Sequence, residues 1–247
     1  MGKVISVVSG KGGTGKSTFS AGLSLSFARE GHNVLLVDLD IGLRSLDIML
    51  GVEHKVVFDI GDVLDKKCKI DDAIVKHKTY TGLRLLCSPS NISKSFHIPS
   101  VIELIERIKK DYDYIILDLP AGLGLSIMMS KSLADLVCVI TTPDTVTIRD
   151  TRKVCDVISE SCKAEFKVVI NRVSKTSMKT SKIKDLDEMI DTIAAPLLGV
   201  LAEDEWIMNT FGYNNDSKKA SAQTEKAFEA MAKRIQGKYI PLVIKTI

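Results

Sequence analysis

A glycine-rich loop near the N-terminus constrains this chain more than any other feature. Residues 10–18 read Gly-Lys-Gly-Gly-Thr-Gly-Lys-Ser-Thr and fit the phosphate-binding pattern G-x-x-x-x-G-K-[ST]. In this pattern backbone N–H groups surround phosphate oxygens, the lysine reaches the β- and γ-phosphates, and the hydroxyl group holds Mg²⁺. A buried-type strand at 3–9 precedes the loop, and helical apolar spacing at 17–30 follows it. This order predicts that the loop delivers a phosphate to a helix N-terminus.

The loop supplies most of the residues that we expect to bind nucleotide. They are Gly10, Lys11, Gly12, Gly13, Thr14, Gly15, Lys16, Ser17 and Thr18. A glycine-rich turn without a ligand is the alternative, and the flanking strand and helix argue against it.

Strands and helices alternate along the remainder of the chain. Apolar runs predict strands at 34–39, 83–87, 114–119, 136–141, 166–170 and 197–201. Helical spacing predicts helices at 98–110, 123–133, 146–160, 183–193 and 220–236. The alternation predicts an α/β fold with a doubly wound, mostly parallel sheet covered on both faces. No linker-like segment divides the 247 residues, so we expect a single domain over 1–247, with a core at 3–237 and a short tail at 238–247.

Composition and charge indicate the cellular setting. The net charge of +3 is too small to argue for nucleic acid, and no apolar run reaches the ~20 residues that a membrane-spanning helix needs. The first predicted strand starts at once, so we expect no signal peptide. We therefore expect a cytoplasmic protein.

Three aspartates stand where predicted strands end. The runs at 34–38 and 114–118 finish on Asp38 and Asp118, and Asp40 follows two residues after the first. Carboxyl ends of parallel strands face the ligand crevice, so these acids are expected beside the phosphates. We expect Ser17 to bind Mg²⁺ directly and Asp38 and Asp118 to hold it through water, while Asp40 orients the attacking water. Strand-end capping is the alternative role for each aspartate.

Lys11, the additional lysine of the loop, suggests a second role for the loop in phosphoryl transfer. Positive charge on the transferring phosphoryl group accelerates its transfer, and a charge supplied by a partner contributes ~10³–10⁵ in rate. If Lys11 supplies this charge in trans, hydrolysis requires a dimer.

The loop and later segments resemble the MinD/ParA family of deviant Walker A ATPases, and the MinD group most closely. The resemblance rests on the two-lysine loop and on segments at 38–47, 118–122, 141–150 and 171–172, and it extends from Lys3 to about Gly237. It implies a P-loop ATPase that uses ATP and Mg²⁺ and dimerises around two ATP molecules, with Lys11 reaching the nucleotide of the partner. Lys11, Lys16 and Asp40 would be the catalytic residues.

The same resemblance implies further contacts and partners. Asn171 would hydrogen-bond the adenine, with Arg172 beside it. An activator and an effector of the MinE and MinC kind are expected, with slow turnover in their absence and a role in division-site placement. Ser45, Leu119, Gly124 and Ala202 depart from the family pattern on switch, partner and base-side surfaces, so partner identity stays open.

The tail bears on membrane association. The MinD group usually carries a basic amphipathic helix that lies in the membrane interface. Residues 241–247 instead include a proline and a single lysine, and we expect a strand or a packed tail there. Peripheral association with the inner face of the cell membrane stays open.

Other functions on the same ATPase core form the alternatives. Five basic residues and no acidic one at 172–184 predict a solvated loop, or a DNA contact of the kind that a ParA-type partitioning ATPase needs. We favour the solvated loop and disfavour nucleic acid. A flagellar-number regulator is another alternative. A metal-cluster carrier is disfavoured because the five cysteines are scattered without a C-x-x-C spacing.

Overall fold

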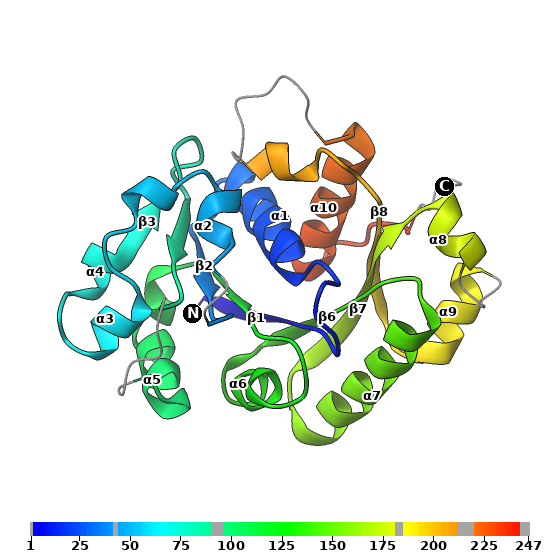
Figure 1. The fold of residues 1–247 in the computed structure, drawn as a ribbon, viewed down its shortest axis with the longest axis horizontal. Helices are drawn as coiled ribbons and strands as arrows, with labels where there is room; N and C mark the ends of the chain where they lie inside the picture. The colour runs from blue at the N-terminus through cyan, green and yellow to red at the C-terminus, as the bar shows by residue number, and fades with distance from the viewer. Residues whose placement is uncertain (1, 42–43, 90–95, 181–184, 212–219, 243–247) are drawn as a thin grey trace.

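The computed structural model describes residues 2–41, 44–89, 96–180, 185–211 and 220–242 (Figure 1). The strands are β1 Lys3–Val8, β2 Val34–Asp38, β3 Ile74–Lys76, β4 Leu83–Leu86, β5 Tyr114–Asp118, β6 Leu136–Thr141, β7 Glu165–Val173 and β8 Leu197–Ala202. Within the described residues they form one eight-stranded sheet in the order β3-β4-β2-β5-β1-β6-β7-β8. Neighbouring strands are parallel, except that β3 runs antiparallel to β4.

Helices cover both faces of this sheet. The α-helices are α1 Lys16–Arg29, α2 Leu46–Met49, α3 Ile60–Leu64, α4 Ile70–Ala73, α5 Ile98–Ile108, α6 Leu125–Leu133, α7 Thr145–Ser161, α8 Lys175–Thr180, α9 Leu186–Ile193 and α10 Ala222–Ile235. Short 3₁₀ turns lie at η1 Glu53–Lys55, η2 Lys109–Asp111 and η3 Ile207–Phe211. The predicted doubly wound α/β fold is confirmed.

Alternation along the strands divides the core into two layers. Helices α1 and α10 lie on one face of the sheet, and α5, α6, α7 and α9 lie on the other (Figure 1). Side chains such as Ile5 and Ile116 belong to the core on the first face, whereas Val4 and Ile115 belong to the core on the second. Successive strand residues point to opposite faces, so a strand covered on both faces is apolar throughout. This explains why the central strands read as continuous apolar runs in the sequence.

Several local expectations need correction. The segment at 172–184 is not simply a loop: β7 extends to Val173 and α8 spans Lys175–Thr180, while 181–184 lie outside the described residues. Edge strand β3 and the short helices α2, α3 and α4 were not predicted.

The tail is only partly described. Residues 238–242 form no strand, and 243–247 lie outside the described residues. Among the described helices, none combines the length and apolar character needed to span a membrane.

A glycine allows α1 and α10 to approach closely. Gly22 of α1 faces the ring of Phe228 on α10, and a Cβ atom at position 22 would collide with that ring. Phe228 is almost fully buried, and its ring centroid lies 6.1 Å from that of Phe19. The ring therefore has little room to move.

We predict that Gly22→Ala destabilises the fold. Glycine to alanine in a helix normally stabilises by ~1 kcal/mol, but overpacking a core typically costs ~1–3 kcal/mol and should prevail here. Urea denaturation measures the change in the free energy of unfolding. The double variant Gly22→Ala/Phe228→Leu should recover part of the loss. A Gly22→Ala chain as stable as the original would contradict this packing argument.

Candidate functional site

The glycine-rich loop leaves β1 and turns sharply into α1. Gly13 and Gly15 have positive φ angles of 80° and 91°, which side chains with a Cβ rarely adopt. A Cβ atom at Gly15 would also collide with the amide of Asn171. The sequence pattern therefore places glycine where both backbone conformation and a close neighbour require it.

The first turn of α1 presents donors to the loop. Gly15 is the N-cap and supplies no side-chain cap, so the first N–H groups of the helix are free to bind an anion. Lys16 is the first helical residue and is buried, with 6% of its surface exposed. The hydroxyl oxygen of Thr14 is buried without a hydrogen-bond partner among the described residues. These features suit a phosphate group.

Neighbouring segments hold the loop in place. The Ser9 hydroxyl donates to the carbonyl oxygen of Lys11 at 2.7 Å, and the N–H of Gly122 donates to the carbonyl oxygen of Ser9 at 2.9 Å. Gly10 lies against Asp150 and Val154, so a Cβ atom there would be crowded by α7. The loop is thus packed between the segment after β5 and helix α7.

The register of three strands brings the predicted aspartates together. Asp118 of β5 lies opposite Asp38 of β2 and opposite Val7 of β1, just before the loop. The Ser20 hydroxyl donates to Oδ1 of Asp118 at 3.0 Å, and the N–H of Asp40 donates to Oδ1 of Asp38 at 3.0 Å. The three aspartates therefore gather beside the first turn of α1.

Burial, together with repulsion from neighbouring aspartates, makes this acid pair hard to ionise. Desolvation, and then the charge of Asp118, raise the pKa of Asp38 to about 8. Desolvation raises the pKa of Asp118 to about 6, against the opposing effects of Ser17, Lys16 and Ser20. Two nearby buried carboxylates without a cation resist holding two negative charges.

A magnesium ion fits this donor set. Oδ2 of Asp118 is buried and has no hydrogen-bond partner among the described residues. The Ser17 hydroxyl is close enough to lower the pKa of the same carboxylate. Hydroxyl, carboxylate and phosphate oxygens are the ligands that Mg²⁺ prefers. Ser17, Asp38 and Asp118 are therefore suitably placed to hold the ion beside a phosphate.

Asn171 and Arg172 stand at the other end of the loop. Nδ2 of Asn171 donates to the carbonyl oxygen of Thr14 at 2.8 Å, and the side chain is buried. Arg172 is exposed with a positive φ of 57°. The sequence did not predict the link between Asn171 and the loop.

A cleft of about 330 Å³ opens along the outer side of the loop. Its lining residues are Lys11, Gly12, Gly13, Thr14, Thr142, Pro143, Asp144, Thr147, Arg172, Ser177 and Glu203. The cleft has room for part of a nucleotide at the carboxyl edge of the sheet, where ligands of open α/β folds bind.

Lys11 is exposed at this cleft. Within the described part of the chain, no carboxylate lies within ion-pair distance of its ammonium group. Partial burial raises the pKa of Asp144, but hydrogen bonds from Thr147 and Thr142 and the charge of Lys11 bring it below its ordinary value. Lys11 is thus accessible at the surface of the loop.

The sequence did not predict the roles of two supporting residues, Ser20 and Asp144. Ser20 follows Ser17 by three residues on α1, and this helical spacing was the available signal for its contact with Asp118. Asp144 caps α7 by accepting from the N–H of Thr147 at 2.9 Å. Its position beside Lys11 depends on the folded chain.

Comparisons with known proteins agree with this geometry. A family model described as an AAA domain matches residues 2–171. The septum site-determining protein MinD of Bacillus subtilis is 33% identical over 248 residues, covering 99% of this chain and 92% of the relative.

Solved structures give the same result. The MinC:MinD cell division protein complex of Aquifex aeolicus contains a chain with a TM-score of 0.84 and 30% identity, covering 99% of this chain and 100% of that one. MinD of Pyrococcus horikoshii complexed with Mg-ADP has a TM-score of 0.79 and 29% identity, covering 95% of this chain and 96% of that one. With its two-lysine loop and acid pair, the chain belongs to the MinD/ParA family of ATPases.

Proposed function

We propose that this protein is a MinD-like switch that dimerises when it binds ATP, hydrolyses ATP to ADP and phosphate, and acts in division-site placement. The observation that carries the proposal is an exposed Lys11 that has no ion-pair partner among the described residues and lies on a phosphate loop beside a buried acid pair. The relatives named septum site-determining protein support the cellular role.

The acid pair and Ser17 form the proposed metal side of the site. Bound Mg²⁺ would neutralise charge on the phosphates. Ser17 would contact the ion directly, and Asp38 and Asp118 would hold it through water. Ser20 would keep the Asp118 carboxylate oriented, because its hydroxyl donates to Oδ1 at 3.0 Å. Mg-ADP in the Pyrococcus horikoshii relative supports this choice of metal.

Lys16 and Asp40 would act on the phosphates and on the attacking water. Lys16 is buried at the start of α1, where its charge is little screened, and it is close enough to Asp118 to lower the pKa of that acid. Asp40 is held beside Asp38 by its own backbone N–H. Its carboxylate would orient water, and the described residues that line the cleft include no histidine that could act as a base. We therefore expect slow turnover until a protein activator binds.

Asn171 would read the base in a fixed orientation. Because Nδ2 donates to the Thr14 carbonyl, Oδ1 is left as the acceptor for a ligand. An acceptor suits the exocyclic amino group of adenine. Arg172 would line the same end of the cleft.

Partner proteins would act on the assembled dimer. The MinC:MinD complex of Aquifex aeolicus supports an effector of the MinC kind, and an activator of the MinE kind is the matching expectation. Peripheral association with the cell membrane remains part of the proposal.

We predict that Lys11→Ala loses dimerisation and hydrolysis, whereas Lys16→Ala loses nucleotide binding. Lys11→Ala should still bind ADP but lose ATP-dependent dimerisation and at least ~10³-fold of stimulated hydrolysis, because the trans charge is missing. Lys16→Ala should lose nucleotide binding itself. Sedimentation with ATP and with ADP, together with phosphate release, measures both effects.

Lys78→Ala is the matched control, because Lys78 is an exposed lysine beyond β3. It should behave as the unaltered chain. A Lys11→Ala chain that dimerises and hydrolyses ATP normally would refute the trans role.

We also predict that Mg²⁺·ADP binding releases about one proton at pH 7, because a cation favours the ionised acid pair. The pKa of Asp38 is raised to about 8, so the free protein carries this proton below that pH and has lost it above. Calorimetry in two buffers of different ionisation enthalpy measures the release. Asp38→Asn should abolish it at pH 7, and the unaltered chain should release little at pH 9. Equal release by Asp38→Asn would contradict the assignment.

A further inference from the structure

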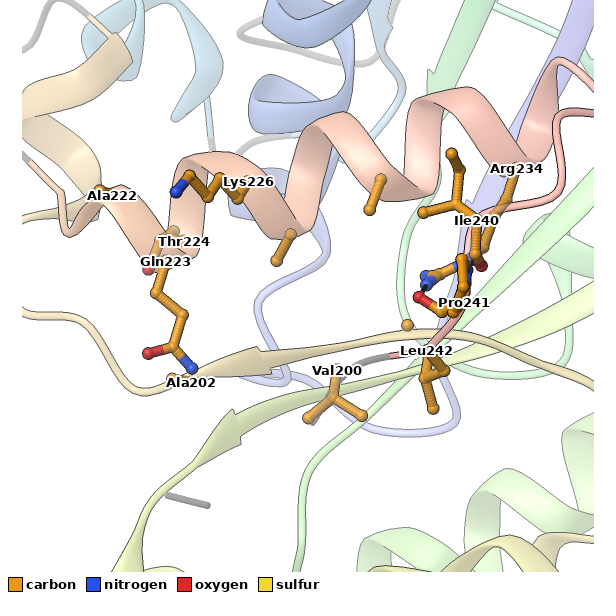
Figure 2. A pocket seen from close by; sticks show the side chains of 13 residues that line it. Val200, Ala202, Ala222, Gln223, Thr224, Lys226, Arg234, Ile240, Pro241 and Leu242 are labelled. Carbon is orange, nitrogen blue, oxygen red and sulfur yellow. Dashed lines mark hydrogen bonds between the residues drawn. The ribbon is translucent and has the colours of Figure 1, made fainter. Parts of the chain in front are cut away.

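A second cavity lies between α10 and the edge strand β8 (Figure 2). Its volume is about 390 Å³, within the ~300–1,000 Å³ typical of small-molecule sites. It lies beside the last strand of the sheet, and its lining includes no residue of the phosphate loop. The proposed ATPase mechanism therefore does not use it.

Small side chains on α10 make room for this cavity. Ala227 and Ala230 line it from the helix, and Val200 and Ala202 line it from β8. Figure 2 shows Gln223 extending from α10 toward Ala202 at one end of the cavity. The walls are therefore mostly apolar along several turns of the helix.

Arg234 stands at the opposite end. Its guanidinium group donates to three backbone carbonyl oxygens: to Leu198 at 2.7 Å, to Ile240 at 3.0 Å and to Pro241 at 2.8 Å. These bonds hold residues 240–242 against the end of the cavity (Figure 2).

Among the described residues, the Arg234 guanidinium group has only neutral hydrogen-bond partners. No carboxylate of the described residues lies within ion-pair distance of it, and the cavity lining contains no acidic side chain. Burial lowers the pKa of Arg234, which reflects the cost of removing the charge from water. The guanidinium also has more N–H donors than these carbonyl groups occupy. An anion would compensate this charge with charge-assisted hydrogen bonds.

We propose that the cavity binds a small amphipathic carboxylate. The carboxylate contacts Arg234, and an unbranched apolar chain extends between Ala230 and Val200 toward Gln223. From residue 223 to residue 234, α10 rises by ~16 Å, so a medium-length chain fits along it. The apolar walls supply affinity, and Arg234 at one end sets the orientation, whereas Lys226, the other cation of the lining, lies toward the Gln223 end.

Titration calorimetry with decanoate tests this site. The protein is loaded with Mg²⁺·ADP, and decanoate is kept below the concentration at which it forms micelles. We expect saturable binding of one decanoate per chain, and binding of the neutral analogue decan-1-ol that is at least ~10-fold weaker, because it lacks the charge that Arg234 recognises.

Two variants and a control locate the ligand. Ala230→Leu fills the groove with a strong helix former, and Arg234→Met removes the charge; each should weaken decanoate binding at least ~10-fold. Lys233→Met removes a neighbouring charge that does not line the cavity and should change nothing. Circular dichroism checks the fold of each variant. If Arg234→Met unfolds, decanoate binding by Ala230→Leu alone tests the proposal.

Several results would overturn the proposal. They are the absence of saturable binding to the unaltered chain, binding only above the micelle concentration, unchanged binding by a folded Ala230→Leu chain, or equal binding of decanoate and decan-1-ol. ATP-dependent dimerisation is measured in parallel, because its failure alone would count against the switch and not against this cavity.

Discussion

The site depends on one electrostatic constraint: two carboxylates are buried side by side next to a phosphate loop. The register of β5 against β2 sets Asp118 opposite Asp38, and the register against β1 sets it opposite Val7, just before the loop begins. Burial and repulsion raise the pKa of both acids. The folded chain therefore holds a place where a cation is favourable, and Lys16 and Ser17 stand where phosphate and metal would meet.

The sequence predicted the parts of this site that short patterns determine. The loop, its flanking strand and helix, and the strand-end positions of Asp38 and Asp118 follow from spacing and apolar runs. Strand β6 was predicted at its observed bounds, because a strand buried on both faces is apolar throughout. The residues of such a strand are enough to predict it.

Other features depend on contacts between distant segments. The three-residue strand β3 has little pattern of its own and forms because β4 offers an edge. The hydrogen bond from Asn171 to Thr14 joins residues 157 positions apart, and no residue spacing in the sequence predicts it. Helix α8 lies where charge alone indicated a loop, since a run of basic residues says little about backbone conformation. The cavity beside α10 likewise arises from the packing of that helix on β8.

Completion of the site across a dimer is the central claim, and mixing two variants tests it most directly. Lys11→Ala and Asp40→Ala chains should each be inactive alone. If Lys11 acts in trans, a mixed dimer joins the intact Asp40 of one protomer to Lys11 of its partner at one of its two sites. Lys11→Ala should weaken dimerisation, because the mixed dimer keeps only one of the two lysine contacts. An equal mixture should therefore hydrolyse ATP well above the sum of the separate variants but at no more than about one quarter of the unaltered rate, the value for random pairing. A mixture that stays at the background of the separate variants would contradict the account.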